Sequence, residues 1–181
     1  MSRITIPTRD NAPAASQPIL DAVQAQLGVT PNLFRLVALS PAALSAMSGL
    51  SGALAKALDV KTRERLAIAT AQVNGCDYCL SAHTYLGLNL AKLSPEEIAL
   101  NRKGASTDPR ADAAVRFGAR VAETRGKVSA ADLAAVKLAG FSEAQIIEII
   151  AVVAENFLTN LINNVAETDI DFPVSRTAEA A

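Results

Sequence analysis

The chain has 181 residues, and its 17 Lys and Arg nearly balance 18 Asp and Glu, so the net charge is −1. Half of the residues are hydrophobic, which excludes global disorder because disorder requires low hydrophobicity and high net charge. The balanced charge also lacks the basic excess of a nucleic-acid binder, so we expect no nucleic-acid partner.

Two features of the sequence predict a soluble, cytoplasmic protein with no membrane partner. The richest apolar stretch, residues 146–154, contains Glu148 and is shorter than the roughly 20 residues that a bilayer span needs. Residues 1–7 lack the continuous apolar segment of a secretory signal.

The first predicted element is an extended arm over residues 1–15, which are rich in Pro, Thr and Ala. Ser16 then predicts a helix cap, and Gly28 predicts the end of that helix. Helical segments from here to residue 174 predict a single all-α domain. Alanine, with 36 residues, favours this reading because it has the highest helix propensity.

Three further helices follow in the first half of the chain. Ser40-Pro41 predicts a helix that runs towards Leu58, and Thr62 predicts the cap of a second helix that continues to Val73. Asn74-Gly75 forms a joint, and a third helix follows from about Cys76 to Leu90.

The second half of the chain contains clear helix starts. The sequence of residues 94–97, Ser-Pro-Glu-Glu, predicts a capping box with proline at the first helical position. Further helices are expected over 110–124 and 129–140, and the longest from Ser142 to about Ala166. No stretch alternates polar and apolar residues over six positions, so no strand is expected.

After Thr168 the chain is expected to be extended, with Phe172 docked on the domain, and residues 175–181 are expected to be frayed.

The only cysteines, Cys76 and Cys79, lie three positions apart. A bridge across so short a loop removes little entropy from the unfolded chain, so it stabilises the fold poorly. In a cytosolic protein such a pair more often performs redox or metal chemistry.

The only histidine, His83, lies four positions after Cys79, so on a helix the two side chains share one face. A neutral imidazole can take the thiol proton and leave a thiolate–imidazolium pair. Cys76 lies in the first turn, where the helix dipole also stabilises a thiolate. The two arguments favour different nucleophiles, and we prefer Cys79 because a hydrogen-bonded base also guides the proton.

Glu64 is predicted to lie beside His83 if the two helices around Asn74-Gly75 form an antiparallel hairpin. At about 1.5 Å per residue, Glu64 lies about 16 Å before the turn and His83 about 12 Å after it. Packed helices are about 8–10 Å apart, so the carboxylate can reach and orient the imidazole. Arg63 or Arg65 could instead pair with this carboxylate.

Several other chemistries can be weighed against this arrangement. A c-type haem site needs a histidine directly after the second cysteine, where Leu80 stands, and a thioredoxin-type motif follows a strand. Zinc held by Cys76, Cys79, His83 and Glu64 remains an alternative, as does a non-catalytic helical interaction protein. Four asparagines near the C-terminus could line a pocket or simply form a polar helix face: Asn156, Asn160, Asn163 and Asn164.

The spacing from Glu64 through Cys76-x-x-Cys79 to His83 resembles the active-site motif of alkylhydroperoxidase D-like (AhpD-like) proteins in the carboxymuconolactone decarboxylase superfamily. The flanking residues 74–84 and the start signal at 94–98 strengthen the likeness, and residues 167–173 resemble the peroxidase-related branch.

The resemblance implies an all-helical fold in which an antiparallel hairpin carries the cysteines, and assembly into trimers or hexamers. It also implies thiol-dependent peroxide reduction without a cofactor. Cys79 would attack the peroxide and become a sulfenic acid, Cys76 would resolve it to a disulfide, and His83 with Glu64 would relay protons.

The resemblance also implies two partners, a hydroperoxide substrate and a thiol or lipoyl-type reductant. Tyr78 stands where the best-known members carry a further histidine between the cysteines. Superfamily members that lack the cysteines decarboxylate a lactone, so the presence of both argues against that activity here.

Overall fold

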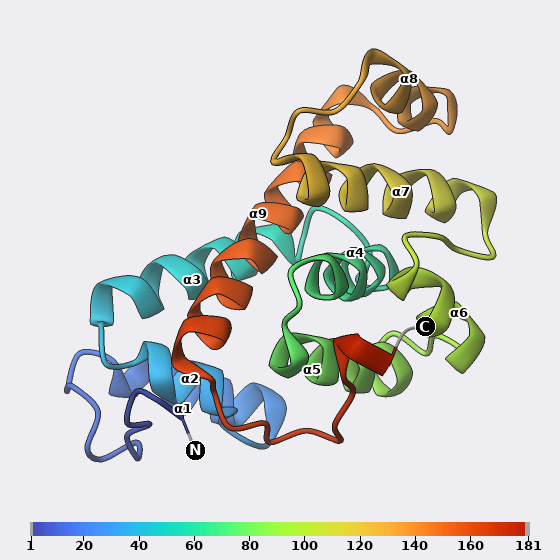
Figure 1. The fold of residues 1–181 in the computed structure, drawn as a ribbon. Coiled ribbons are helices and arrows are strands. Elements are labelled where there is room, and N and C mark those ends of the chain that lie inside the picture. Colours follow the sequence, from blue (N-terminus) through green and yellow to red (C-terminus); the bar gives the residue numbers. More distant parts are fainter. Residues whose placement is uncertain (1, 180–181) are drawn as a thin grey trace.

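The computed structural model describes residues 2–179, which are helical without any strand (Figure 1). This confirms the predicted all-α class. The helices, in chain order, are α1 Gln17–Leu27, α2 Asn32–Val37, α3 Pro41–Leu54, α4 Val60–Val73, α5 Asp77–Asn89, α6 Pro95–Arg102, α7 Pro109–Thr124, α8 Ala130–Leu138 and α9 Glu143–Ala166, followed by the short 3₁₀ helix η1 Thr177–Glu179.

Helix α4 lies at the centre of the fold and packs against α5, α6, α7 and α9. Its alanines are buried on several sides, which lets neighbouring helices come close. At Gly118 of α7, an added Cβ would lie 2.5 Å from Cδ2 of Leu66. The close approach of α7 to α4 therefore requires glycine at this position.

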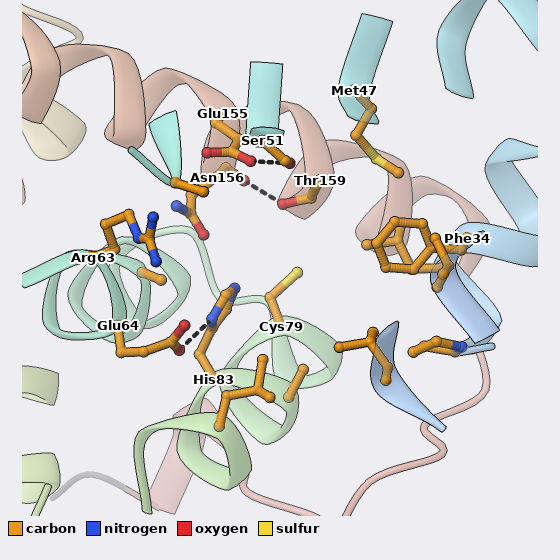
Figure 2. A pocket seen from close by; sticks show the side chains of 18 of the residues that line it. Phe34, Met47, Ser51, Arg63, Glu64, Cys79, His83, Glu155, Asn156 and Thr159 are labelled. Atoms are coloured by element: carbon orange, nitrogen blue, oxygen red, sulfur yellow. Dashed lines mark hydrogen bonds and ion pairs between the residues drawn. The ribbon is translucent and has the colours of Figure 1, made fainter. Parts of the chain in front are cut away.

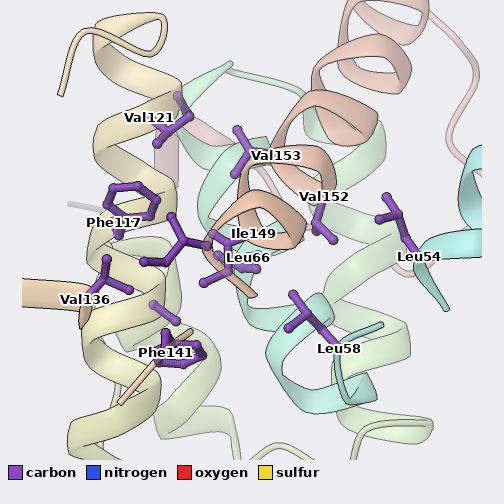
Figure 3. Packing of buried hydrophobic residues seen from close by; sticks show 13 residues of the cluster. Leu54, Leu58, Leu66, Phe117, Val121, Val136, Phe141, Ile149, Val152 and Val153 are labelled. Carbon is purple, nitrogen blue, oxygen red and sulfur yellow. The ribbon is translucent and has the colours of Figure 1, made fainter. Parts of the chain in front are cut away.

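The apolar core is divided around α4. One cluster joins α4 to α7 and α9 through fully buried side chains such as Leu66 and Ile149 (Figure 3). A second cluster joins α4 to α5 and α6 and contains both cysteines. A third holds α1, α2 and α3 together. The cysteines therefore lie where the central helix meets a neighbour, enclosed by packed side chains.

Several helix ends differ from the sequence predictions. Helix α4 is capped by Asp59, whose Oδ1 accepts a hydrogen bond from the Thr62 backbone at 3.0 Å. Ser16 precedes α1 but donates its hydroxyl to the Ala38 carbonyl instead of capping. Helix α3 ends at Leu54, short of the predicted Leu58. Asp, Ser and Thr are all good caps, so tertiary contacts decide which one is used.

The start of α6 also differs from the predicted capping box. Ser94 accepts the backbone N–H of Glu97, but the Glu97 carboxylate turns away to bind Arg65. The carboxylate that would complete the capping box forms a buried ion pair instead. Complete capping boxes do begin α8, at Ser129 with Asp132, and α9, at Ser142 with Gln145.

After α9 the chain returns across α5 as an extended segment (Figure 1). Phe172 docks edge-on against Tyr78, as predicted, with ring centroids 5.9 Å apart. Ser175 and Thr177 bind Ser81 and Asp77 of α5. Residues 175–181 are predicted to be frayed, but hydrogen bonds anchor this segment as far as residue 177. Residues 180 and 181 lie outside the described part of the chain.

Helix α9 is longer and more apolar than the stretch 146–154 alone indicates. Its 24 residues are enough in length and composition to cross a membrane. One face of α9 packs on α3, α4, α5 and α7 and buries Asn156, Asn160 and Asn163, whereas only 33% of its most apolar 18-residue stretch is buried.

Candidate active site

The two cysteines lie at the start of α5, directly after a tight joint from α4. Gly75 has a φ of +63°, a left-handed conformation that glycine adopts without strain. Cys76 then occupies the N-cap position, and its sulfur accepts the backbone N–H of Cys79 at 3.3 Å. Cys76 is therefore fixed as the helix cap and completely buried.

Cys79 lies one turn further along α5, and its sulfur points into an open space between helices (Figure 2). Both cysteines are free thiols. The Cys79 sulfur accepts a hydrogen bond from Nδ2 of Asn163, on α9, at 3.2 Å. Of the two thiols, Cys79 is the one that a molecule in this space would meet.

His83 and Glu64 make the contact that the sequence predicts. Nδ1 of His83 lies 2.9 Å from Oε2 of Glu64, and the other ring nitrogen points into the open space beside Cys79 (Figure 2). Neither neighbouring arginine pairs with Glu64: Arg65 binds Glu97 at 2.7 Å, and Arg63 donates to the Leu54 carbonyl at 3.3 Å. Glu64 is thus left for the imidazole.

The environment separates the acidities of the two thiols. The pKa of Cys79 is lowered to about 7, and the largest cause is a hydrogen bond from Cys76. The charge of His83 and the amides of Asn163 and Asn160 also lower this pKa, whereas burial acts to raise it. The same thiol–thiol hydrogen bond, together with burial, raises the pKa of Cys76. The cap position therefore does not make Cys76 the thiolate, because its proton is held by the neighbouring sulfur.

The imidazole is poised to carry the opposite charge. Burial alone would lower the His83 pKa, but the charge and hydrogen bond of Glu64 outweigh it, and the pKa is raised. A raised imidazole pKa beside a lowered thiol pKa favours a thiolate–imidazolium pair at neutral pH.

The open space is a cavity of about 460 Å³. One wall is apolar and comes from α1, α2, α3 and their connections, and includes Val23, Leu27, Val29, Leu33, Phe34 and Met47. The opposite end is polar and includes Ser51, Arg63, Glu155, Asn156 and Thr159 (Figure 2). Cys79, His83 and Glu64 line the cavity, whereas Cys76 does not.

Sequence reasoning missed the wall of this cavity. Phe34 and Met47 have ordinary apolar spacing for helices that pack on a core, and nothing local marks them as lining a site. Of the four asparagines that the sequence offers as a possible pocket lining, Asn156 lines the cavity. The contact of Asn163 with Cys79 joins positions 84 residues apart, so no local spacing could reveal it.

A shared metal ion has no ready place in this arrangement. Among residues 2–179, no three His, Cys, Asp or Glu side chains gather closely enough to hold one. The four residues of the zinc alternative are not gathered into such a group in the described part of the chain.

Comparison with known proteins agrees with the motif. Residues 41–124 match the carboxymuconolactone decarboxylase family, and this span contains Glu64, both cysteines and His83. The resemblance expected from the sequence is thereby confirmed. No curated protein matches the sequence.

Solved structures share the whole fold. An uncharacterised peroxidase-related protein from Ralstonia eutropha JMP134, with an alkylhydroperoxidase AhpD core, superposes with a TM-score of 0.83 and 27% identity over 94% of this chain and 92% of that one. A peroxidase-related protein from Silicibacter sp. TM1040 gives 0.80 and 22% over 93% and 91%. The debrominase Bmp8, in its C82A form with 2,3,4-tribromopyrrole, gives 0.79 and 19% over 93% and 91%.

Proposed function

Because residues 41–124 of this chain are related to the carboxymuconolactone decarboxylase family, whose superfamily contains enzymes, we propose that the protein is an AhpD-like thiol-dependent oxidoreductase. It reduces organic hydroperoxides with the Cys76–Cys79 pair. The observation that carries this proposal is the Cys79 sulfur facing a cavity, with a second thiol behind it and the His83–Glu64 pair beside it.

In the first step the Cys79 thiolate attacks the terminal oxygen of the hydroperoxide. A sulfur–oxygen bond forms, the oxygen–oxygen bond breaks, and the departing alkoxide takes a proton from the His83 imidazolium. The products are an alcohol and a Cys79 sulfenic acid. Glu64 holds the imidazole through Nδ1, which keeps the other nitrogen available to donate.

In the second step Cys76 attacks the sulfenic acid. A disulfide forms between the two sulfurs, and the hydroxyl leaves as water after taking one proton. The cap position of Cys76 suits it to this role, because its sulfur is fixed against Cys79 and away from the cavity. An external dithiol, of thiol or lipoyl type, then returns two electrons and two protons.

The cavity favours an organic substrate over hydrogen peroxide. The apolar wall from α1–α3 would bury the carbon chain or ring of the substrate, while the polar end around Arg63 and Asn156 would meet an oxygen-bearing head. Such dithiol chemistry suits the cytoplasm, where thiols are kept reduced.

The test is one turnover with a matched pair of variants. Fully reduced protein is mixed with one equivalent of cumene hydroperoxide, and thiol loss and intact mass are followed. The parent should lose two hydrogens and gain one disulfide. Cys76→Ser should react once and stop as a sulfenic acid that dimedone traps, whereas Cys79→Ser should react slower by roughly a hundredfold or more. A Cys79→Ser variant that reacts as fast as the parent contradicts the proposal.

We further propose that copies of this chain assemble through the outer face of α9. This face carries large apolar residues at intervals of three, four, seven or eight positions, between 37 and 65% exposed: Ile147, Ile150, Leu158, Leu161 and Val165. An apolar stripe along a helix normally has a covering partner. The mass in solution should be that of a trimer or hexamer, and Leu161→Glu should shift it to a smaller species. A monomeric parent contradicts this proposal.

A further inference from the structure

Two amides from α9 reach the buried end of α5. Asn163 is 2% exposed and Asn160 is 1% exposed, and both lie among the packed residues around Cys79. The Asn163 amide donates to the Cys79 sulfur at 3.2 Å. A sulfur that has left water needs such donors if it is to carry a negative charge.

The Asn160 amide is held in place from its other side. Its Oδ1 accepts a hydrogen bond from Nδ2 of Asn74 at 2.8 Å, so its NH₂ group must turn the other way. That Nδ2 is buried and has no hydrogen-bond partner within residues 2–179, although the Asn160 amide acts on the Cys79 thiol. An unpartnered buried donor costs free energy, and its use in another state of the protein would explain why it is retained.

The joint between α4 and α5 completes this arrangement. Asn74 ends α4, and α9 holds it twice, through Asn160 and through Asn164, whose Nδ2 donates to the Asn74 carbonyl at 3.0 Å. The joint that carries the cysteines is therefore fastened to the helix that carries the two donors.

We propose that Asn163 and Asn160 form a donor pair that stabilises negative charge on Cys79. The Asn163 amide donates to the thiolate sulfur. The Asn160 amide also acts on the sulfenate, because its free N–H would donate to the sulfenate oxygen. The pair are positioning residues, because they act on the nucleophile and do not line the cavity. This inference rests on the proposed function for the sulfenate, and its thiolate part can be tested alone.

Other groups around Cys79 also influence its charge and must stay constant in the test. They come from each element packed against it and comprise Arg63 and Glu64 on α4, Cys76, Tyr78 and His83 on α5, Glu155 on α9, and Asp171 in the C-terminal segment. None of them is altered by a change at position 163.

The experiment measures the ionisation of Cys79 in full-length protein that carries Cys76→Ser, which leaves one thiol and keeps a hydroxyl donor in the cap. Thiolate absorbance at 240 nm is titrated against pH. Asn163→Leu should raise the Cys79 pKa by about one to two pH units, because it removes one hydrogen bond to a charged group. Asn163→Asp, which keeps the shape but adds a negative charge, should raise it further. Asn89→Leu, the same substitution at an exposed position of α5 whose amide donates to the Tyr85 carbonyl of its own helix, is the control.

Each outcome decides the inference. A pKa in Asn163→Leu within about 0.3 of the background, in a variant with unchanged circular dichroism, overturns it, as would an equal rise in Asn89→Leu. If Asn163→Leu does not fold, Asn163→Ala, which also removes the donor and adds no charge, gives the answer by the same criterion. The result is independent of turnover: the parent failing to consume hydroperoxide contradicts the proposed function, whereas an unmoved thiol pKa contradicts the donor pair.

Discussion

Two buried glutamates on neighbouring helices show how this molecule separates structure from chemistry. Glu97 on α6 is 3% exposed and Glu64 on α4 is 8% exposed. The Glu97 carboxylate pairs with Arg65 at 2.7 Å and accepts the backbone N–H of Thr107 at 2.9 Å. It also accepts hydrogen bonds from the Thr107 and Ser106 hydroxyls and from the Asn101 amide. The Glu64 carboxylate forms a hydrogen bond with His83 alone among the described residues, and it faces a cavity.

The two carboxylates differ in how much of their hydrogen-bonding capacity is already used. Burial alone would raise the pKa of Glu97, but the hydrogen bonds from Ser106, Thr107 and Asn101 outweigh it and lower the pKa to about 2. Its bonds tie α6 to the loop before α7. Glu64 keeps acceptor capacity beside a titratable partner, which is the arrangement that proton transfer requires.

The largest expected effect breaks the structural carboxylate. Glu97→Gln removes the charge that neutralises Arg65, and breaking a buried pair leaves the other charge uncompensated. The free energy of unfolding should fall by about 3 kcal/mol at pH 7, measured by urea denaturation. The rate of hydroperoxide reduction per folded molecule should stay within a factor of two or so.

The pH dependence of stability sharpens this prediction. Because the folded pKa of Glu97 is lowered to about 2 from an unfolded value near 4.3, its contribution is present above about pH 4.3 and is lost as the pH falls towards 2. The parent should therefore lose more stability than Glu97→Gln between pH 5 and pH 2. Parallel stability curves for the two proteins would mean that Glu97 is not the group responsible.

The next effect breaks the site and spares the fold. Glu64→Gln keeps a hydrogen-bonding group beside His83 but removes the charge that favours the imidazolium. The rate of reaction with cumene hydroperoxide should fall by roughly ten- to a hundredfold, in stopped-flow measurements at pH 7. Stability should change by less than about 1 kcal/mol. If Glu64→Gln and Glu97→Gln lose stability and rate alike, the contrast between the two carboxylates is not real.

The sequence predicts the part of this molecule that depends on local pattern. The starts of α7 and α9 follow from Asp108-Pro109 and Ser142, which are strong helix-start signals. The contact of Glu64 with His83 follows from helix rise once the helices on either side of Asn74-Gly75 are taken to pack against each other.

The remainder depends on contacts between distant segments. Asp59 competes with Thr62 for the cap of α4, and the sequence alone does not rank them. Glu97 has the spacing of a capping box, but its carboxylate leaves the box to bind Arg65, 32 residues earlier, and the loop residues Ser106 and Thr107. The amide of Asn163 reaches Cys79 because α9 crosses α5, a crossing that no periodicity of either helix determines.

The most direct test of the account is residue-resolved alkylation of the reduced protein against pH. Iodoacetamide is added in brief pulses from pH 5 to pH 10, and peptide mass spectrometry gives the modification rate at each cysteine. Labelling of Cys79 should rise with a midpoint near pH 7, while Cys76, whose pKa is raised, should stay unlabelled throughout the neutral range. Faster labelling of Cys76, or one shared midpoint near the ordinary thiol value of about 8.5, would contradict the assignment of Cys79 as the poised thiolate.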